Sequence, residues 1–179
     1  MFVLQMDVTF LQIKPKGRKM KNGIRTALLA LMLVATTQLM AKDLTKMDLI
    51  NKAKKEVGEV TPKQLKTMLD DGEDVIVLDV RENEQHAEGS IPFDDFNKEN
   101  FRAVTRGNLE WKINKIIPDK DAKIVTYCRR GGRGALAAQV LREMGYKNAT
   151  TLKGGLKGWA KAGYPIKTGL GITKLSIEK

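Results

Sequence analysis

The residues with the clearest chemical potential lie in the stretch IVTYCRRGGRGALAAQV, residues 124–140. Its cysteine, Cys128, ends an apolar, strand-like segment, and a helix-like segment begins a few residues later. Free N–H groups at a helix N-terminus and nearby guanidinium groups favour the thiolate, which is the nucleophilic form of cysteine. Because glycines let successive N–H groups converge on an anion, we predict a reactive cysteine that handles an anionic substrate. The loop after the cysteine consists of Arg129, Arg130, Gly131, Gly132 and Arg133.

The same cysteine has a simpler interpretation, since a lone cysteine is more often buried and inert. Three arginines within five residues argue against an apolar burial site here. Cys128 is the only cysteine and His86 the only histidine, which leaves no ligand set for zinc or an iron–sulfur cluster and weakens a Cys/His hydrolase dyad. We expect no internal disulfide, no metal and no cofactor.

Short strands and helices alternate around this loop. Apolar, β-branched runs at residues 74–80 and 122–128 are typical of buried parallel strands, and residues 148–155 indicate a last short strand. The alternation predicts an α/β fold, with a small, mostly parallel sheet and helices on both faces. The segments with helical spacing are 42–58, 61–72, 106–117, 134–145 and 155–163.

Several side chains have predicted positions within these elements. Thr61 is expected to cap its helix, with Gln64 completing a capping box. Trp111 and Trp159 are both expected in the core or in a pocket wall. The tail after residue 165 is polar and expected at the periphery. The residues expected on one helix face are Leu44, Met47, Ile50, Ala53 and Val57 in the first helix, and Leu136, Val140, Leu141 and Met144 in the helix after the cysteine.

Residues 20–41 have the parts of a secretory signal peptide, with basic Lys21 and Arg25, an apolar run and a cleavage site near Ala41. The apolar run is shorter than the roughly 20 residues of a membrane-spanning helix. We therefore expect cleavage, no stable membrane span after it, and a periplasmic or secreted protein. The expected organisation is an over-long extension at 1–19, the signal peptide at 20–41, a lead-in helix at 42–58, one domain at 59–168 and a tail at 169–179.

The net charge of the whole chain is +11, but part of it lies in the leader. After residue 41 the chain has 26 basic and 20 acidic residues. These basic residues are spread along the sequence and are not interleaved with aromatic residues, so a solvated surface explains them better than nucleic-acid binding does. We expect no nucleic-acid partner.

Three blocks of the sequence, in this order and spacing, resemble a single-domain rhodanese over residues 59–166. Cys128, Gly131 and Arg133 match the active-loop motif of that family, Cys-x-x-Gly-x-Arg. Asp79 and Arg81 match at the end of the first predicted strand. The blocks are VLDVRENEQHAEGSIP (77–92), VTYCRRGGRGALAAQVLREMGY (125–146) and LKGGLKGWAKAGYPI (152–166).

The resemblance implies a rhodanese α/β fold and a thiosulfate-type sulfurtransferase. Cys128 would take a sulfane sulfur from a small anionic donor such as thiosulfate, hold it as a persulfide, and pass it to a thiol or cyanide-like acceptor. The loop arginines would attract the donor, and the loop N–H groups would stabilise the persulfide. Asp79 and Arg81 would support the loop. Arg133 would either contact the substrate or brace the loop by pairing with a carboxylate such as Asp79.

The chain departs from the family pattern at four positions: Gln85 replaces a glutamate, Ser90 a histidine, and Phe93 and Asp94 two small residues. These changes bear on substrate range or partner docking. One alternative function is a sulfur-carrier or docking module of the same fold, since no second cysteine is present to resolve a persulfide. Another is a phosphatase-like hydrolase, but related phosphatases have a longer loop than the four residues between Cys128 and Arg133.

Overall fold

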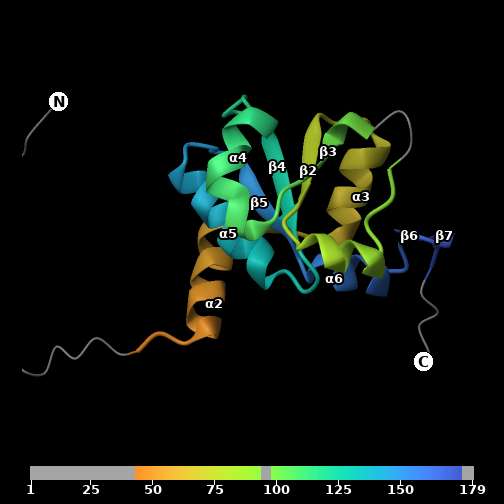
Figure 1. The fold of residues 1–179 in the computed structure, drawn as a ribbon, viewed down its shortest axis with the longest axis horizontal. Helices are drawn as coiled ribbons and strands as arrows, with labels where there is room; N and C mark the ends of the chain where they lie inside the picture. Colours follow the sequence, from red (N-terminus) through yellow and green to blue (C-terminus); the bar gives the residue numbers. More distant parts are fainter. Residues whose placement is uncertain (1–42, 94–97, 175–179) are drawn as a thin grey trace, which may run out of the picture. The chain divides into compact units, whose positions relative to one another are not determined.

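A computed structural model describes residues 43–93 and 98–174 of the chain (Figure 1). The predicted extension at 1–19 and the predicted signal peptide at 20–41 lie outside the described residues, as does the end of the tail, 175–179. Within the described ranges, no helix has both the length and the apolar character needed to cross a membrane.

The centre of the fold is a five-stranded sheet in the order β1-β5-β4-β2-β3, in which every pair of neighbouring strands is parallel. β2 and β4 are apolar and buried, as their sequences predict. The α/β fold with a mostly parallel sheet is therefore confirmed. The strands are β1 (Glu59–Val60), β2 (Val75–Asp79), β3 (Phe101–Ala103), β4 (Lys123–Tyr127) and β5 (Ala149–Leu152).

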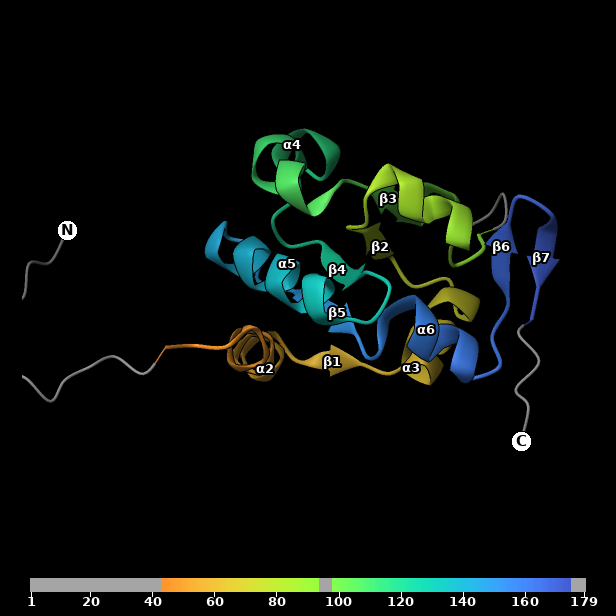
Figure 2. The same ribbon diagram turned by 60° about the horizontal axis from the view of Figure 1, so that its bottom comes forward.

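Helices cover both faces of the sheet (Figure 2). One face packs against α2 (Lys46–Val57), α4 (Leu109–Ile116) and α5 (Gly132–Glu143), and the other against α3 (Pro62–Asp70) and α6 (Gly155–Lys161). Side chains alternate along β4, so Val125 and Tyr127 face α3 and α6 while Ile124 and Cys128 belong to the core under α5. The described residues also form three short 3-10 helices: η1 (Asn83–Glu88), η2 (Lys98–Asn100) and η3 (Arg106–Asn108).

Two helices begin with the capping boxes that orient them. Thr61 accepts a hydrogen bond from the Gln64 amide, and the Gln64 side chain accepts one from the Thr61 amide, as predicted. Thr45 and Asp48 form the same arrangement at the start of α2. The hydrogen bonds from Thr45 hold the pKa of the exposed Asp48 carboxyl below its usual value. The hydrogen bonds of these two capping boxes thus fix the residue at which each helix begins.

The buried face of α5 consists mainly of small residues that were not predicted. Of the four residues expected to face inward, Leu141 is fully buried, Val140 and Met144 are half-buried and pack against the core, and half-buried Leu136 is the exception. The reason is close packing, since a Cβ on Gly134 would lie 2.8 Å from the Thr151 hydroxyl oxygen. Only small side chains fit at this distance from β4 and β5. The residues that occupy this face are Gly134, Ala135, Ala137 and Ala138.

β5 is not the last strand, which corrects a second prediction. The segment expected to be a polar peripheral tail contains an antiparallel hairpin of β6 (Ile166–Thr168) and β7 (Gly171–Thr173). Ser90 bridges to Lys167 in β6, so the hairpin is tied to the chain before Pro92. Its strands are short and mostly exposed, and they lack the apolar pattern that predicts a strand.

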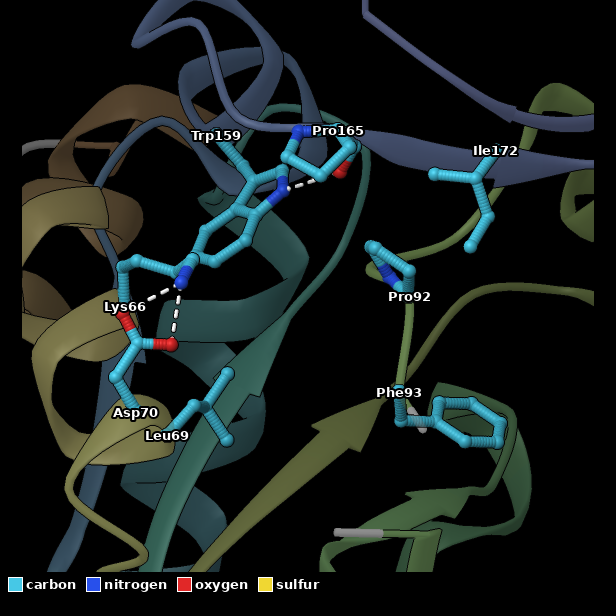
Figure 3. A pocket seen from close by; sticks show the side chains of 8 residues that line it. All are labelled: Lys66, Leu69, Asp70, Pro92, Phe93, Trp159, Pro165 and Ile172. Atoms are coloured by element: carbon cyan, nitrogen blue, oxygen red, sulfur yellow. Dashed lines mark hydrogen bonds and ion pairs between the residues drawn. The ribbon is translucent and has the colours of Figure 1, made fainter. Parts of the chain in front are cut away.

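The two tryptophans have opposite environments. Trp159 is 1% exposed, and its indole N–H donates to the Pro165 carbonyl at 2.7 Å. It forms part of the wall of a cavity of about 220 Å³, opposite Pro92 and Phe93 (Figure 3). Trp111 is 83% exposed, so its predicted burial was wrong. Leu109 and Ile113 are the buried residues of α4. Trp111 lies two positions from each of them along the helix, so its side chain points away from the core.

Candidate active site

Cys128 lies directly after β4, at the carboxyl end of a central parallel strand, and is 3% exposed. The loop that follows turns into α5 at Gly131, whose φ of +89° places it in the left-handed region that glycine adopts readily. This arrangement of strand, loop and helix is the one predicted. It brings the amides at the N-terminus of α5 close to the cysteine.

The loop is held from the other side by the first turn of α6. The Leu156 amide donates to the Cys128 carbonyl at 2.9 Å, and the Lys157 amide donates to the Arg129 carbonyl at 3.0 Å. The carbonyl groups of Cys128 and Arg129 therefore bind α6, whereas that of Gly131 accepts from the Ala135 amide of α5. In the part of the chain that the structure describes, the amides of Arg129, Arg130 and Gly131 donate to no backbone or side-chain acceptor. These donors are free to bind an anion.

Cys128 opens into a cavity of about 560 Å³. The loop supplies one wall, through Arg129, Arg130, Gly132 and Arg133. Gln85 from η1 supplies a second. The third wall is α2, through Lys46, Met47, Ile50 and Lys54, a contribution that the sequence did not predict.

The three loop arginines have different partners. Arg129 lies 2.9 Å from the Glu88 carboxylate. Arg133 donates to the Gln85 side chain and lies 3.8 Å from the Glu82 carboxylate. The suggested pairing with a carboxylate is therefore present, but the carboxylate is Glu82 and not Asp79. Arg130 is exposed and forms no ion pair with any described residue. Arg130 is therefore the arginine whose charge is most available to a substrate.

Asp79 forms a buried ion pair with Arg81. The guanidinium Nη2 lies 2.6 Å from Oδ2 of the carboxylate, and Nε lies 2.9 Å from Oδ1. Burial disfavours the charged guanidinium, but the hydrogen bond and charge of Asp79 prevail and raise the pKa of Arg81. Arg81 also donates to the Gln85 carbonyl at 3.0 Å. The pair thus acts on the loop through Gln85, which in turn holds Arg133.

Tyr127 and His86 pack around this ion pair, outside the Cys128 cavity. Burial, followed by the negative charge of Asp79, raises the pKa of the Tyr127 phenol well above its usual value. The Arg81 guanidinium lies 5.5 Å from the centre of the Tyr127 ring. His86 is part-buried, with Nε2 3.6 Å from the Asp79 carboxylate. It lines two smaller cavities and none of the Cys128 cavity, which agrees with a packing role.

The substitutions noted in the sequence fall in two places. Gln85 lies in the Cys128 cavity and contacts Arg133. Ser90 pairs with β6, and Phe93 lines other cavities and packs against Phe101. Among the substitutions that fall within residues 43–93, only Gln85 therefore lines the Cys128 cavity, where it can contact a small substrate.

Residues 61–162 match the family model of the rhodanese-like domain. The chain belongs to the rhodanese family. This rhodanese is 32% identical over 110 residues to a sulfurtransferase of Allochromatium vinosum, covering 62% of this chain and 94% of that protein. It is 33% identical over 110 residues to the thiosulfate sulfurtransferase GlpE of Haemophilus influenzae, with the same coverage.

Among solved structures, this rhodanese is similar to RPA3614 of Rhodopseudomonas palustris, a protein of unknown function described as a possible tyrosine phosphatase. The identity is 30%, the TM-score is 0.59, and the match covers 71% of this chain and 98% of the other. The relatives together support a sulfurtransferase function in general terms. The matched residues 61–162 include the Cys128 loop and the first turn of α6, which donates hydrogen bonds to it.

Proposed function

We propose that this rhodanese moves a sulfane sulfur from thiosulfate, or a similar anionic donor, to a thiophilic acceptor through a persulfide on Cys128. The observation that carries the proposal is the Cys128 loop, in which three unpaired amides follow the only cysteine directly and Arg130 lines the same cavity. One of the relatives is named a thiosulfate sulfurtransferase, which supports this donor.

In the first half of the reaction, the Cys128 thiolate attacks the outer sulfur of thiosulfate. A sulfur–sulfur bond forms to Cys128, the donor's sulfur–sulfur bond breaks, and sulfite leaves with the bonding electron pair. Arg130 attracts the donor dianion. The free amides of Arg129, Arg130 and Gly131 then stabilise the negative charge of the persulfide.

In the second half, a cyanide ion or a thiolate attacks the outer sulfur of the persulfide. The bond to that sulfur breaks, and Cys128 leaves as a thiolate with the electron pair, ready for the next donor. Since Cys128 is the only cysteine of the chain, no internal thiol can take the sulfur. The acceptor is therefore a second molecule.

The test is the intact mass of the protein after thiosulfate and again after cyanide. The expected result is a gain of one sulfur, about 32 Da, that cyanide removes and that Cys128→Ser lacks. A folded protein that gains no mass, or a gain that persists in Cys128→Ser, would overturn the proposal. Sulfur uptake only from a protein persulfide would favour the carrier module, and phosphate release from an aryl phosphate would favour the hydrolase.

We also propose that residues 20–41 direct export of the protein and are then removed. The order of basic residues, apolar run and a candidate cleavage site at Ala41 supports this. Sequencing the N-terminus of the mature protein from a periplasmic fraction or culture medium tests it. A mature protein that keeps Met20 would contradict export by a cleaved signal.

A further inference from the structure

α2 forms a wall of the Cys128 cavity although it precedes the segment that matches the rhodanese model, residues 61–162. It contributes two lysines, Lys46 and Lys54, and two apolar residues between them, Met47 and Ile50. Lys46, Ile50 and Lys54 follow one another at four-residue spacing, and Met47 lies three residues before Ile50, so all four border the same side of the helix. Two of them contact the outer part of the cavity as exposed side chains, Lys46 and Met47.

The wall is fixed to the domain. Ala53 and Val57 of α2 are buried, and the Gln139 side chain of α5 donates to the Glu56 carboxylate at 2.8 Å. Ile50 reaches the loop itself, since a Cβ on Gly132 would lie 2.9 Å from its Cδ1. α2 is therefore held in place before a substrate binds, and a surface that is already ordered loses less conformational entropy on binding.

The two lysines of α2 that line the cavity differ in their ion-pair partners. Lys54 is paired with Glu59 at 2.9 Å, whereas Lys46 forms no ion pair with any residue of the described ranges. No aspartate or glutamate is among the residues that line the cavity. Lys46 and Arg130 thus leave two cations open to a ligand, with Met47, which is 52% exposed, on the same helix side as Lys46.

The size of the cavity exceeds the needs of the donor. Thiosulfate has only a few atoms, whereas about 560 Å³ lies within the range of roughly 300–1,000 Å³ typical of pockets for larger organic ligands. Because the cysteine loop and α2 are different walls of this cavity, a donor held at the loop leaves space next to α2. Its mixture of thioether, methyl and ammonium groups is complementary to a molecule with methylene groups and a carboxylate.

We propose that α2 selects the acceptor, and that Lys46 and Met47 are specificity-determining residues for organic thiols that carry a carboxylate. The inference rests on the proposed function. The acceptor's methylene groups pack on Met47, and its carboxylate lies near Lys46. Its thiolate attacks the outer sulfur of the persulfide, that sulfur leaves Cys128, and the Cys128 thiolate departs with the electron pair.

The experiment measures transfer from thiosulfate to three acceptors: cyanide, the uncharged thiol 2-mercaptoethanol, and glutathione, a tripeptide thiol with two carboxylates. Lys46→Gln is expected to raise the KM for glutathione about two- to fivefold more than the KM for either other acceptor, because one charge contact is lost. Met47→Ser is expected to raise the KM for glutathione about three- to tenfold. Lys52→Gln and Leu49→Ser are the matched controls, because they remove a charge and a large apolar side chain at exposed positions of α2 that do not line the cavity.

The outcomes separate the two proposals. If the unaltered protein transfers sulfur to cyanide but the variants change the KM of all three acceptors equally, or of none, the role of α2 is overturned while the proposed function stands. If the controls act like Lys46→Gln and Met47→Ser, the effect comes from helix stability and the inference fails. If the unaltered protein transfers sulfur to no acceptor, the proposed function fails and this inference with it.

Discussion

Gly155 lies directly against the peptide carbonyl of Cys128. A Cβ at residue 155 would lie 2.2 Å from that oxygen and 2.7 Å from the Gly131 nitrogen, and the φ of Gly155 is +59°. The first turn of α6 can donate its amides to the loop only because no side chain is present there. The position of the nucleophile therefore depends on a glycine more than twenty residues further along the chain.

Gly155→Ala should displace the loop and destabilise the protein. Steric overlap and the left-handed conformation together predict a loss of about 3–5 kcal/mol in the free energy of unfolding. Urea denaturation measures this loss. Gly163→Ala is the control, because Gly163 has φ +82° but no atom near its missing Cβ, so only about 1–2 kcal/mol is expected. Equal losses in the two variants would show that contact with the loop is unimportant.

Gln85→Glu should weaken the binding of anionic donors. Arg133 donates to the Gln85 side chain, and a carboxylate at that position would offset the guanidinium charge inside the cavity. The expected rise in the KM for thiosulfate is about two- to fivefold at low salt, diminishing as salt is added. Gln64→Glu adds the same charge on α3 and should leave the KM unchanged. A Gln85→Glu protein with an unaltered KM would contradict an electrostatic role for Arg133.

Arg81→Met should be among the most destabilising single changes, because it leaves the buried Asp79 carboxylate without its partner. The expected loss is about 3–5 kcal/mol in the free energy of unfolding, measured by denaturation. The double change Asp79→Leu with Arg81→Met removes both charges and should recover part of the loss. If the double variant is as unstable as the sum of the two single variants, the two charges do not interact.

Alkaline pH should weaken the fold through Tyr127. Its pKa is higher in the folded protein than the ordinary value of 10.0. The neutral phenol is therefore favoured in the folded state, and this stability is present below pH 10 and is lost as the pH rises above it. Tyr127→Phe cannot ionise, so its free energy of unfolding should fall less between pH 9 and about pH 11 than that of the unaltered protein. Parallel declines in the two proteins would contradict this prediction.

The sequence predicted those parts of the fold that depend on local signals. The capping residues Thr61 and Gln64, the apolar strands and the glycines after Cys128 each indicate their conformation within a few residues. The active loop and the parallel sheet could therefore be predicted from the amino-acid sequence alone.

Features that depend on contacts between distant segments could not be predicted. The pairing of Arg133 with Gln85 instead of Asp79 depends on where Arg81 is buried, which no short pattern encodes. Likewise, the spacing of Met47 and Ile50 predicts a helix face but not the surface it meets. Trp111 shows the same limit, because a large aromatic residue is usually buried and here the phase of α4 turns it to solvent.

α2 lines the Cys128 cavity but precedes the residues that match the rhodanese model, and this has a consequence for evolution. Cys128, its loop and the first turn of α6 pack closely and are joined by hydrogen bonds, so a substitution in one of them disturbs the others. The outward positions of α2 are free of that constraint, as Met47 is half exposed and Lys46 has no ion pair among the described residues. Under the proposed role of α2, substitutions there change which acceptors reach Cys128 without disturbing the sheet, so related proteins can differ in acceptor while they keep the same cysteine loop.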